Sequence, residues 1–228
     1  MIIERFLPSM EGATVLEEVS IPRTNLEYEV KSYVLVNLDG KEFNLFSRKV
    51  ELFCLPTLIG FDDSKKITFS ETYFLAWSLL KERGLPVVPE VWKVGSDKVF
   101  TTNLIAERGS VYDQKIDSVI ERDTLPMDSQ FVKIPKVEIE SEADRLLELA
   151  NKNGIELMSD GPFHIKVNPD GSFNIFVLDI GKVRIYSMPK DLPREVKDNN
   201  YYYISKALRE FTYINGNIKV LRDARGLS

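Results

Sequence analysis

The turn Asp39-Gly40 constrains the fold of this chain more than any other feature of its sequence. A run rich in β-branched and aromatic residues, 29–37, precedes the turn, and a second strand-like run, 42–48, follows it. An Asp-Gly pair between two such runs is the strongest short-range signal for a β-hairpin. We therefore predict two antiparallel strands near the start of the chain. With 43% hydrophobic residues, the 228-residue chain can bury a sizeable core.

A helix is expected after this hairpin. Thr68 and Glu71 have the spacing of a capping box, in which each residue satisfies a backbone N–H group of the other. Tyr73 and Trp77 repeat at the helical period, and Gly84 supplies a stop signal. The two end signals together predict a helix between them.

Two further strands are expected after the helix, over residues 87–94 and 98–106, joined by a turn at residues 95–97. The front half of the chain is thus β-rich with one embedded helix. Prolines and mixed charges weaken the pattern over residues 107–137. We place there a connecting segment and a short helix over residues 111–122.

The second half of the chain begins with a helix. Ser141 has the spacing of a cap, apolar residues follow at the helical period, and Gly154 supplies the stop. Residues 164–167 and 172–178 flank an Asn-Pro-Asp-Gly turn and are expected to form a second hairpin. A last helix is expected over residues 195–211. The whole pattern predicts an α+β protein.

The chain has a single histidine, His164, and a single cysteine, Cys54. A disulfide within the chain and a zinc site of four Cys and His ligands are therefore excluded. The net charge of −5, without a basic run, argues against a nucleic-acid partner. The apolar runs are short, and charged side chains lie among the first ten residues, which argues against a membrane segment and a signal peptide. We expect a cytoplasmic protein in which Cys54 is a core residue.

The order of these elements resembles the protein-kinase-like superfamily, and four segments resemble aminoglycoside-phosphotransferase-type kinases. Residues 71–89, which begin with Glu and end with Gly-Leu-Pro-Val-Val-Pro, are similar to helix αC and the following strand. Residues 104–113 resemble the strand and hinge that hold the adenine. Residues 146–181 resemble the stretch from helix αE through the catalytic loop to the Asp-Phe-Gly motif, and residues 200–211 resemble helix αF.

The resemblance implies a two-lobed protein-kinase-like fold of minimal size. Residues 1–106 would form a β-rich N-lobe with one αC-like helix, and residues 107–137 would form the hinge and connecting segment. Residues 138–228 would form a small, mainly helical C-lobe. The resemblance also implies ATP as the cofactor, together with Mg or Mn.

The implied metal site lies at the end of the second hairpin. Asp179, followed by Ile180 and Gly181, matches the metal-binding Asp of the Asp-Phe-Gly motif. An ungapped alignment of the catalytic loop places Ser159 at the base and His164 at the second metal ligand. A shift of one residue places Asp160 at the base, and a carboxylate can accept or orient the proton of the nucleophile, which the Ser159 hydroxyl cannot do. An ordinary turn also explains both segments.

The phosphate-binding side departs further from the family pattern. The expected strand Lys position is occupied by Phe46. Arg48 lies on the same strand face and is the substitute partner expected for Glu71, whereas Lys49 could reach that face only through a bulge. Glu107, in the hinge-like segment, is a further candidate for nucleotide binding. No Gly-x-Gly-x-x-Gly precedes the first hairpin, so no glycine-rich loop is expected to cover the phosphates.

Three functions stay open from the sequence. The first is a degenerate kinase-like domain, or pseudokinase, that binds at most a nucleotide and acts through a protein partner. The second is an active minimal ATP-dependent phosphotransferase with Asp160 as the base. The third is an interaction protein without a nucleotide site.

Overall fold

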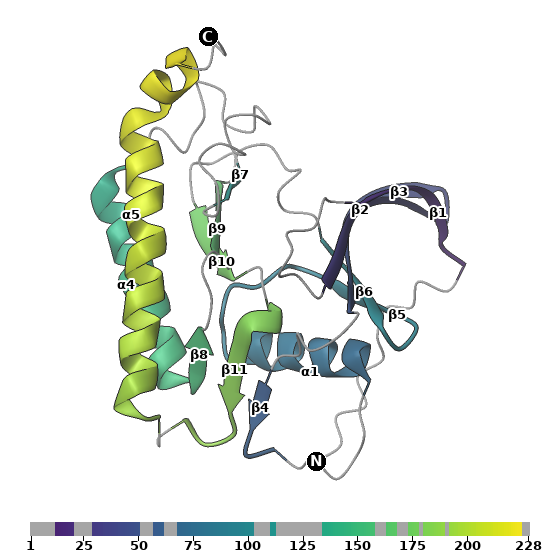
Figure 1. The fold of residues 1–228 in the computed structure, drawn as a ribbon, viewed down its shortest axis with the longest axis horizontal. Coiled ribbons are helices and arrows are strands. Elements are labelled where there is room, and N and C mark those ends of the chain that lie inside the picture. The colour runs from purple at the N-terminus through teal and green to yellow at the C-terminus, as the bar shows by residue number, and fades with distance from the viewer. Residues whose placement is uncertain are drawn as a thin grey trace.

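A computed structural model describes the following residues of the chain: 12–20, 29–50, 57–61, 68–102, 110–112, 134–157, 163–167, 173–177, 180–189 and 192–224. Within these residues the protein has a mixed α+β architecture, as expected, with a five-stranded sheet, two three-stranded sheets and the helices α1, α4 and α5. The two small sheets lie between the long helices and the five-stranded sheet (Figure 1). None of the helices in this described part of the chain is both long and apolar enough to cross a membrane.

The five-stranded sheet is antiparallel and has the strand order β1-β2-β3-β6-β5. Its strands are β1 (Thr14–Ser20), β2 (Glu29–Leu38), β3 (Lys41–Val50), β5 (Val91–Val94) and β6 (Lys98–Thr102). The predicted hairpin with its turn at residues 39–40 is confirmed. The strand pair around the turn at 95–97 is confirmed as well, but its first strand begins at Val91 and not at residue 87, and residues 103–106 lie outside the described part of the chain. Strand β1 was not predicted.

This sheet is strongly curved. Lys98 of β6 lies 3.1 Å from a carboxylate oxygen of Glu18 on β1, although β2 and β3 lie between these strands. In a flat sheet three strand spacings would separate the two strands by about 14 Å. The curvature encloses a small apolar cluster of Val34, Val36, Leu45 and Phe100.

Helix α1 (Phe69–Glu82) begins and ends where the sequence predicts. The Thr68 hydroxyl accepts a hydrogen bond from the Glu71 backbone N–H, and the Glu71 carboxylate accepts one from the Thr68 N–H at 2.8 Å. Trp77 is buried and donates its indole N–H to the Val88 carbonyl at 2.8 Å. The helix therefore packs with a defined orientation against the segment that follows it.

Removal of the cap is expected to have a moderate effect. Thr68→Ala should lower the free energy of unfolding by about 1 kcal/mol, because the Glu71 backbone N–H loses its acceptor, the Thr68 hydroxyl, whereas the backbone N–H of residue 68 keeps the Glu71 carboxylate. Urea unfolding followed by circular dichroism measures the change, and Thr68→Ser, which keeps the hydroxyl, should stay close to wild type. The difference between wild type and Thr68→Ala should shrink as the pH falls below the ordinary Glu71 pKa of 4.5, since a protonated carboxyl is a poorer acceptor. A Thr68→Ala variant as stable as wild type would contradict the role of the cap.

The back half contains α4 (Lys136–Lys152), the hairpin of β9 (Phe163–Val167) and β10 (Phe173–Val177), and α5 (Arg194–Ala224). The predicted hairpin is confirmed. Helix α4 begins five residues before the expected cap Ser141, because Ile139 extends its buried face toward the N-terminus.

Two further predictions need correction. Helix α5 continues past residue 211 to Ala224; one interior glycine, Gly216, costs a helix only about 1 kcal/mol and does not end it. A short helix was expected over 111–122, but its first two residues lie in a strand, β7 (Ser110–Tyr112), which pairs with β9. Residues 113–122 lie outside the described part of the chain.

The third sheet combines segments from both halves of the chain. Strand β11 (Val183–Tyr186) is central, with β4 (Thr57–Ile59) parallel on one side and β8 (Ile155–Leu157) antiparallel on the other. A short 3-10 helix, η2 (Ile180–Lys182), leads directly into β11. Because each strand has only three or four residues, none of them carries a strong signal in the sequence.

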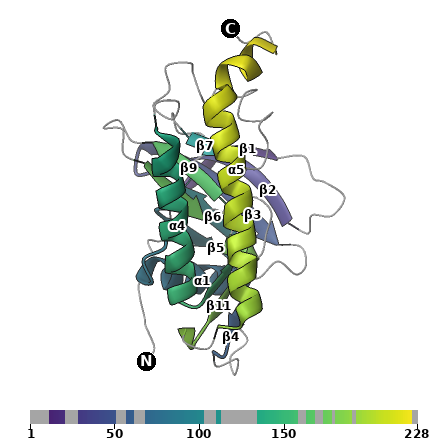
Figure 2. The ribbon, with the colours of Figure 1, turned by 90° about the vertical axis from the view of Figure 1, so that its left-hand side faces the viewer.

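One apolar core connects both halves. It includes Tyr73 and Leu80 of α1, Leu146 of α4, Ile155 of β8 and Val177 of β10. Helices α4 and α5 lie side by side and cover one side of this core (Figure 2). The core is thus continuous across the expected hinge at residues 107–137.

Candidate functional site

The described residues on either side of 178–179 contact helix α1 or the segment that follows it. Val177, the last residue of β10, donates its N–H to the Pro86 carbonyl at 2.8 Å and forms a bridge with Val87. Ile180, the first residue of η2, is fully buried in the core that includes α1. The chain therefore enters and leaves residues 178–179 next to α1 and the segment that follows it.

Three of the expected site residues, Glu107, Asp160 and Asp179, lie outside the described residues. His164 lies in the middle strand of a sheet, opposite Tyr112 of β7 and Phe176 of β10. The main chain there belongs to an ordinary antiparallel ladder.

Arg48 is buried on the face of the five-stranded sheet that α1 covers. It lies in register with Val99 of β6, and Val99 lies in register with Lys93 of β5. Residues paired across strands share a face, and Lys93 of this row forms an ion pair with Glu71 of α1. Arg48 is 6% exposed, and its guanidinium carbon lies 5.2 Å from the centre of the Phe46 ring. Phe46 and Arg48 thus share one strand face, as expected.

Lys49 lies on the opposite face. The pairing of β3 with β2 and β6 is continuous through Arg48 and Lys49, with no bulge between them. The Lys49 ammonium group is half-exposed and lies 3.6 Å from the carboxylate of Asp97 in the neighbouring turn. Lys49 was expected to reach the face of Arg48 only if the strand had a bulge. Because the strand has no bulge there, Lys49 does not point to that face.

Glu71 has a different partner from the one expected. Its carboxylate lies 3.6 Å from the Lys93 ammonium group and also caps its own helix. Hydrogen bonds from the N–H and then the hydroxyl of Thr68 lower the pKa of Glu71, and the Lys93 charge lowers it further. Arg48 is two strands from Lys93, about 10 Å across a sheet. Lys93 thus lies at the Glu71 carboxylate, where we expected Arg48.

A buried asparagine organises the strand that leads to Asp160. Asn200 of α5 is 0% exposed. It accepts a hydrogen bond from the Leu157 N–H at 2.8 Å, and donates to the Ile155 carbonyl at 2.8 Å and the Asn151 side-chain carbonyl at 2.9 Å. One side chain thus holds both ends of β8, just before residues 158–162.

A buried carboxylate on the same strand makes a second set of hydrogen bonds. Glu156 is 3% exposed and accepts hydrogen bonds from Arg184, the Tyr186 hydroxyl and Asn199 at 3.3, 3.1 and 3.0 Å. Burial raises the pKa of Tyr186, and the Glu156 charge raises it further. Strand β8 is therefore tied to both β11 and α5 by buried polar groups.

Sequence reasoning missed both of these residues. Asparagine and glutamate are mostly exposed residue types, so neither draws attention by itself. The available signal for Asn200 was its position on the apolar side of a helix, four residues before Ile204.

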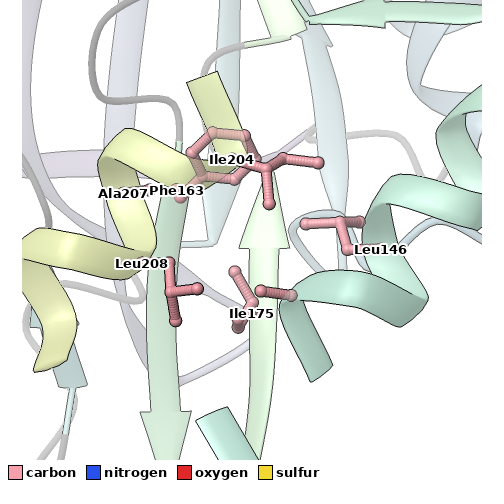
Figure 3. Close-up of a pocket in the computed structure, with 7 residues that line it drawn as sticks. Leu146, Phe163, Ile175, Ile204, Ala207 and Leu208 are labelled. Carbon is pink, nitrogen blue, oxygen red and sulfur yellow. The ribbon is translucent and has the colours of Figure 1, made fainter. Parts of the chain in front are cut away.

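The apolar hollow between α4, α5 and the β9–β10 hairpin is part of the core. Leu146, Phe163, Ile175, Ile204 and Leu208 line it, as Figure 3 shows, with no polar side chain among the lining residues and no room for a water molecule. Among the residues that the structure describes, no three His, Cys, Asp or Glu side chains gather as a metal site. No family model and no curated protein matches this chain.

Proposed function

We propose that this chain is a degenerate protein-kinase-like domain that binds ATP with Mg or Mn and acts through a protein partner in the cytoplasm. The proposal is supported by one observation: β10 and η2, which flank residues 178–179, contact α1 and the segment that follows it. Nucleotide binding in a kinase requires a strand cation, a helix next to it and a metal-binding Asp to converge on one site. In this chain the residues that flank 178–179 contact α1 and the segment after it, and α1 packs on β5 and β6 of the sheet that contains β3.

The order of elements supports the same proposal. An antiparallel sheet has α1 inserted between β3 and β5, and it is followed by α4, the β9–β10 hairpin, the Asp-Ile-Gly segment and α5. This is the order that we expect of a two-lobed kinase-like arrangement. A buried Arg48 fits phosphate oxygens chemically, because a guanidinium group offers two parallel donors.

The departures from the family pattern favour a degenerate domain over an active enzyme. The carboxylate of the helix, Glu71, forms its ion pair with Lys93 of β5 and not with Arg48 of β3. In kinases a pair between the strand cation and the helix carboxylate must be in place for transfer. The sequence also has no glycine-rich loop before the first hairpin. Binding without efficient phosphoryl transfer is the function that these residues support best.

Nucleotide-dependent thermal unfolding tests this proposal. ATP with Mg at about 100 times its Kd stabilises a protein by about 2.7 kcal/mol, or about 5–10 °C in Tm for a chain of this size. Asp179→Ala is expected to lose the shift, whereas Asp144→Ala, on the exposed side of α4, should keep it. The shift should also fall when EDTA removes the metal. No shift in the wild type at millimolar nucleotide would contradict the proposal and favour an interaction protein without a nucleotide site.

An active phosphotransferase is the second candidate, and one observation favours it. Strand β8, directly before Asp160, is held by the buried side chains of both Glu156 and Asn200, which is more support than a solvent-exposed turn requires. Autophosphorylation and phosphate release from ATP distinguish the candidates. Turnover that Asp160→Ala abolishes would establish the active enzyme, whereas turnover that survives would remove Asp160 from the mechanism. Absence of turnover together with a nucleotide shift supports the degenerate domain.

A further inference from the structure

Arg83 connects three segments that are far apart in the sequence. It follows the last residue of α1, and its Nη1 atom donates hydrogen bonds to the Asn153 carbonyl at 2.6 Å and to the Tyr186 carbonyl at 2.9 Å. The two acceptors lie 70 and 103 residues further along the chain. Asn153 follows the last residue of α4, and Tyr186 is the last residue of β11. One guanidinium group thus joins the ends of two helices and a strand.

The strand that Arg83 holds comes directly after the Asp179 segment. Residues 180–182 form η2 and continue without interruption into β11. At the end of β11, the Tyr186 N–H donates to the Gly154 carbonyl at 2.8 Å, and the Ser187 N–H donates to the Ile59 carbonyl at 2.9 Å. The end of β11 is therefore hydrogen-bonded to the residue before β8, to the last residue of β4 and to Arg83.

The two hydrogen bonds of Arg83 are partly buried, so their loss should destabilise the segments that they join. Arg83 is partly buried, and the loss of hydration lowers the pKa of its guanidinium group. Hydrogen bonds from a charged donor are roughly twice as strong as those between neutral groups. Carbonyl groups that lose such a donor inside the protein are not fully compensated by water. Loss of the Arg83 side chain should therefore destabilise the end of β11 more than segments that Arg83 does not contact.

We propose that Arg83 is a positioning residue for the nucleotide site: it locks β11 to the end of α1 and thereby holds η2, which follows Asp179 in the chain, in place against that helix. The link to nucleotide rests on the proposed function, whereas the locking of β11 does not. Arg83 acts on the Asp179 segment through β11 and η2 and is not expected to touch the nucleotide.

Amide hydrogen exchange of the full chain tests the lock without any nucleotide. Arg83→Met keeps an apolar stem but has no donor, and it should accelerate exchange about tenfold in peptides that cover β4 and β11, relative to peptides of α5. Arg83→Lys keeps a charged donor and should restore part of the protection. Ile204→Val in α5 is the control for stability, and it should change all three peptides by a common factor. Equal acceleration in β11 and α5, or none, would overturn the proposal.

Nucleotide affinity provides the second measurement. The Kd of Mg-ATP, measured below the unfolding transition, should rise about tenfold in Arg83→Met, recover in part in Arg83→Lys and stay unchanged in Ile204→Val. An unchanged Kd in Arg83→Met, with β11 unlocked, would overturn the positioning role. If the wild type binds no Mg-ATP, the proposed function and the positioning role both fail, while hydrogen exchange still decides whether Arg83 locks β11.

Discussion

Replacement of Asn200 by leucine should lower the free energy of unfolding by about 4 kcal/mol. Leucine has nearly the same size, so the change leaves no cavity. It removes the partners of the buried Leu157 N–H and Ile155 carbonyl, and each unsatisfied buried group costs about 1–3 kcal/mol. Urea unfolding followed by circular dichroism measures the loss. Nucleotide binding should weaken as well, because β8 leads to Asp160.

Two further variants test whether the loss of stability comes from the hydrogen bonds of Asn200. Asn199→Leu changes the neighbouring helix residue, which is only part-buried and makes one hydrogen bond to Glu156, and should cost about 1 kcal/mol. Asn200→Asp keeps the acceptor for Leu157 but faces the Ile155 carbonyl with a negative charge. Burial and repulsion raise the pKa of such a carboxyl, so this variant should gain stability relative to wild type as the pH falls. An Asn200→Leu protein within about 1 kcal/mol of wild type would contradict the role of Asn200.

A substitution at Gly154 should also have a large effect, and Gly84 provides its control. Both glycines have a left-handed backbone, with φ of +67° and +79°. A Cβ atom at Gly154 would lie 2.9 Å from the Pro189 Cα and 3.3 Å from the Tyr186 carbonyl oxygen, whereas at Gly84 it would meet nothing within 4 Å. Gly84→Ala should therefore cost only the conformational penalty of about 1 kcal/mol. Gly154→Ala adds a clash with backbone and should cost about 3 kcal/mol in total.

The comparison of these two variants isolates the contact from the backbone conformation. Thermal and urea unfolding of both proteins give the difference in stability directly. Equal losses at Gly84 and Gly154 would show that β11 and the segment around Pro189 move aside at little cost. A larger loss at Gly154 would confirm that the junction between α4, β8 and β11 is tightly packed.

The candidate site was predictable only in part, and Arg48 and Glu71 illustrate why. The strand face of Arg48 follows from the alternation of side chains along β3, which is a local property. The partner of Glu71 depends on which strand lies next to the first turn of α1, and the sheet order places β5 there. Sequence spacing alone contains no information about that neighbour. The positions of Asp160 and Asp179 as site residues stay predictions.

The sequence by itself determined the elements whose signals are local. The Asp39-Gly40 hairpin, helix α1 with its capping box and the β9–β10 hairpin each depend on residues a few positions apart, and such short-range interactions form without the rest of the fold. Tertiary structure alone decided the sheet of β4, β8 and β11, and the roles of Asn200 and Arg83. Strands of three or four residues cannot persist alone, and a polar side chain becomes a structural centre only when distant segments bury it.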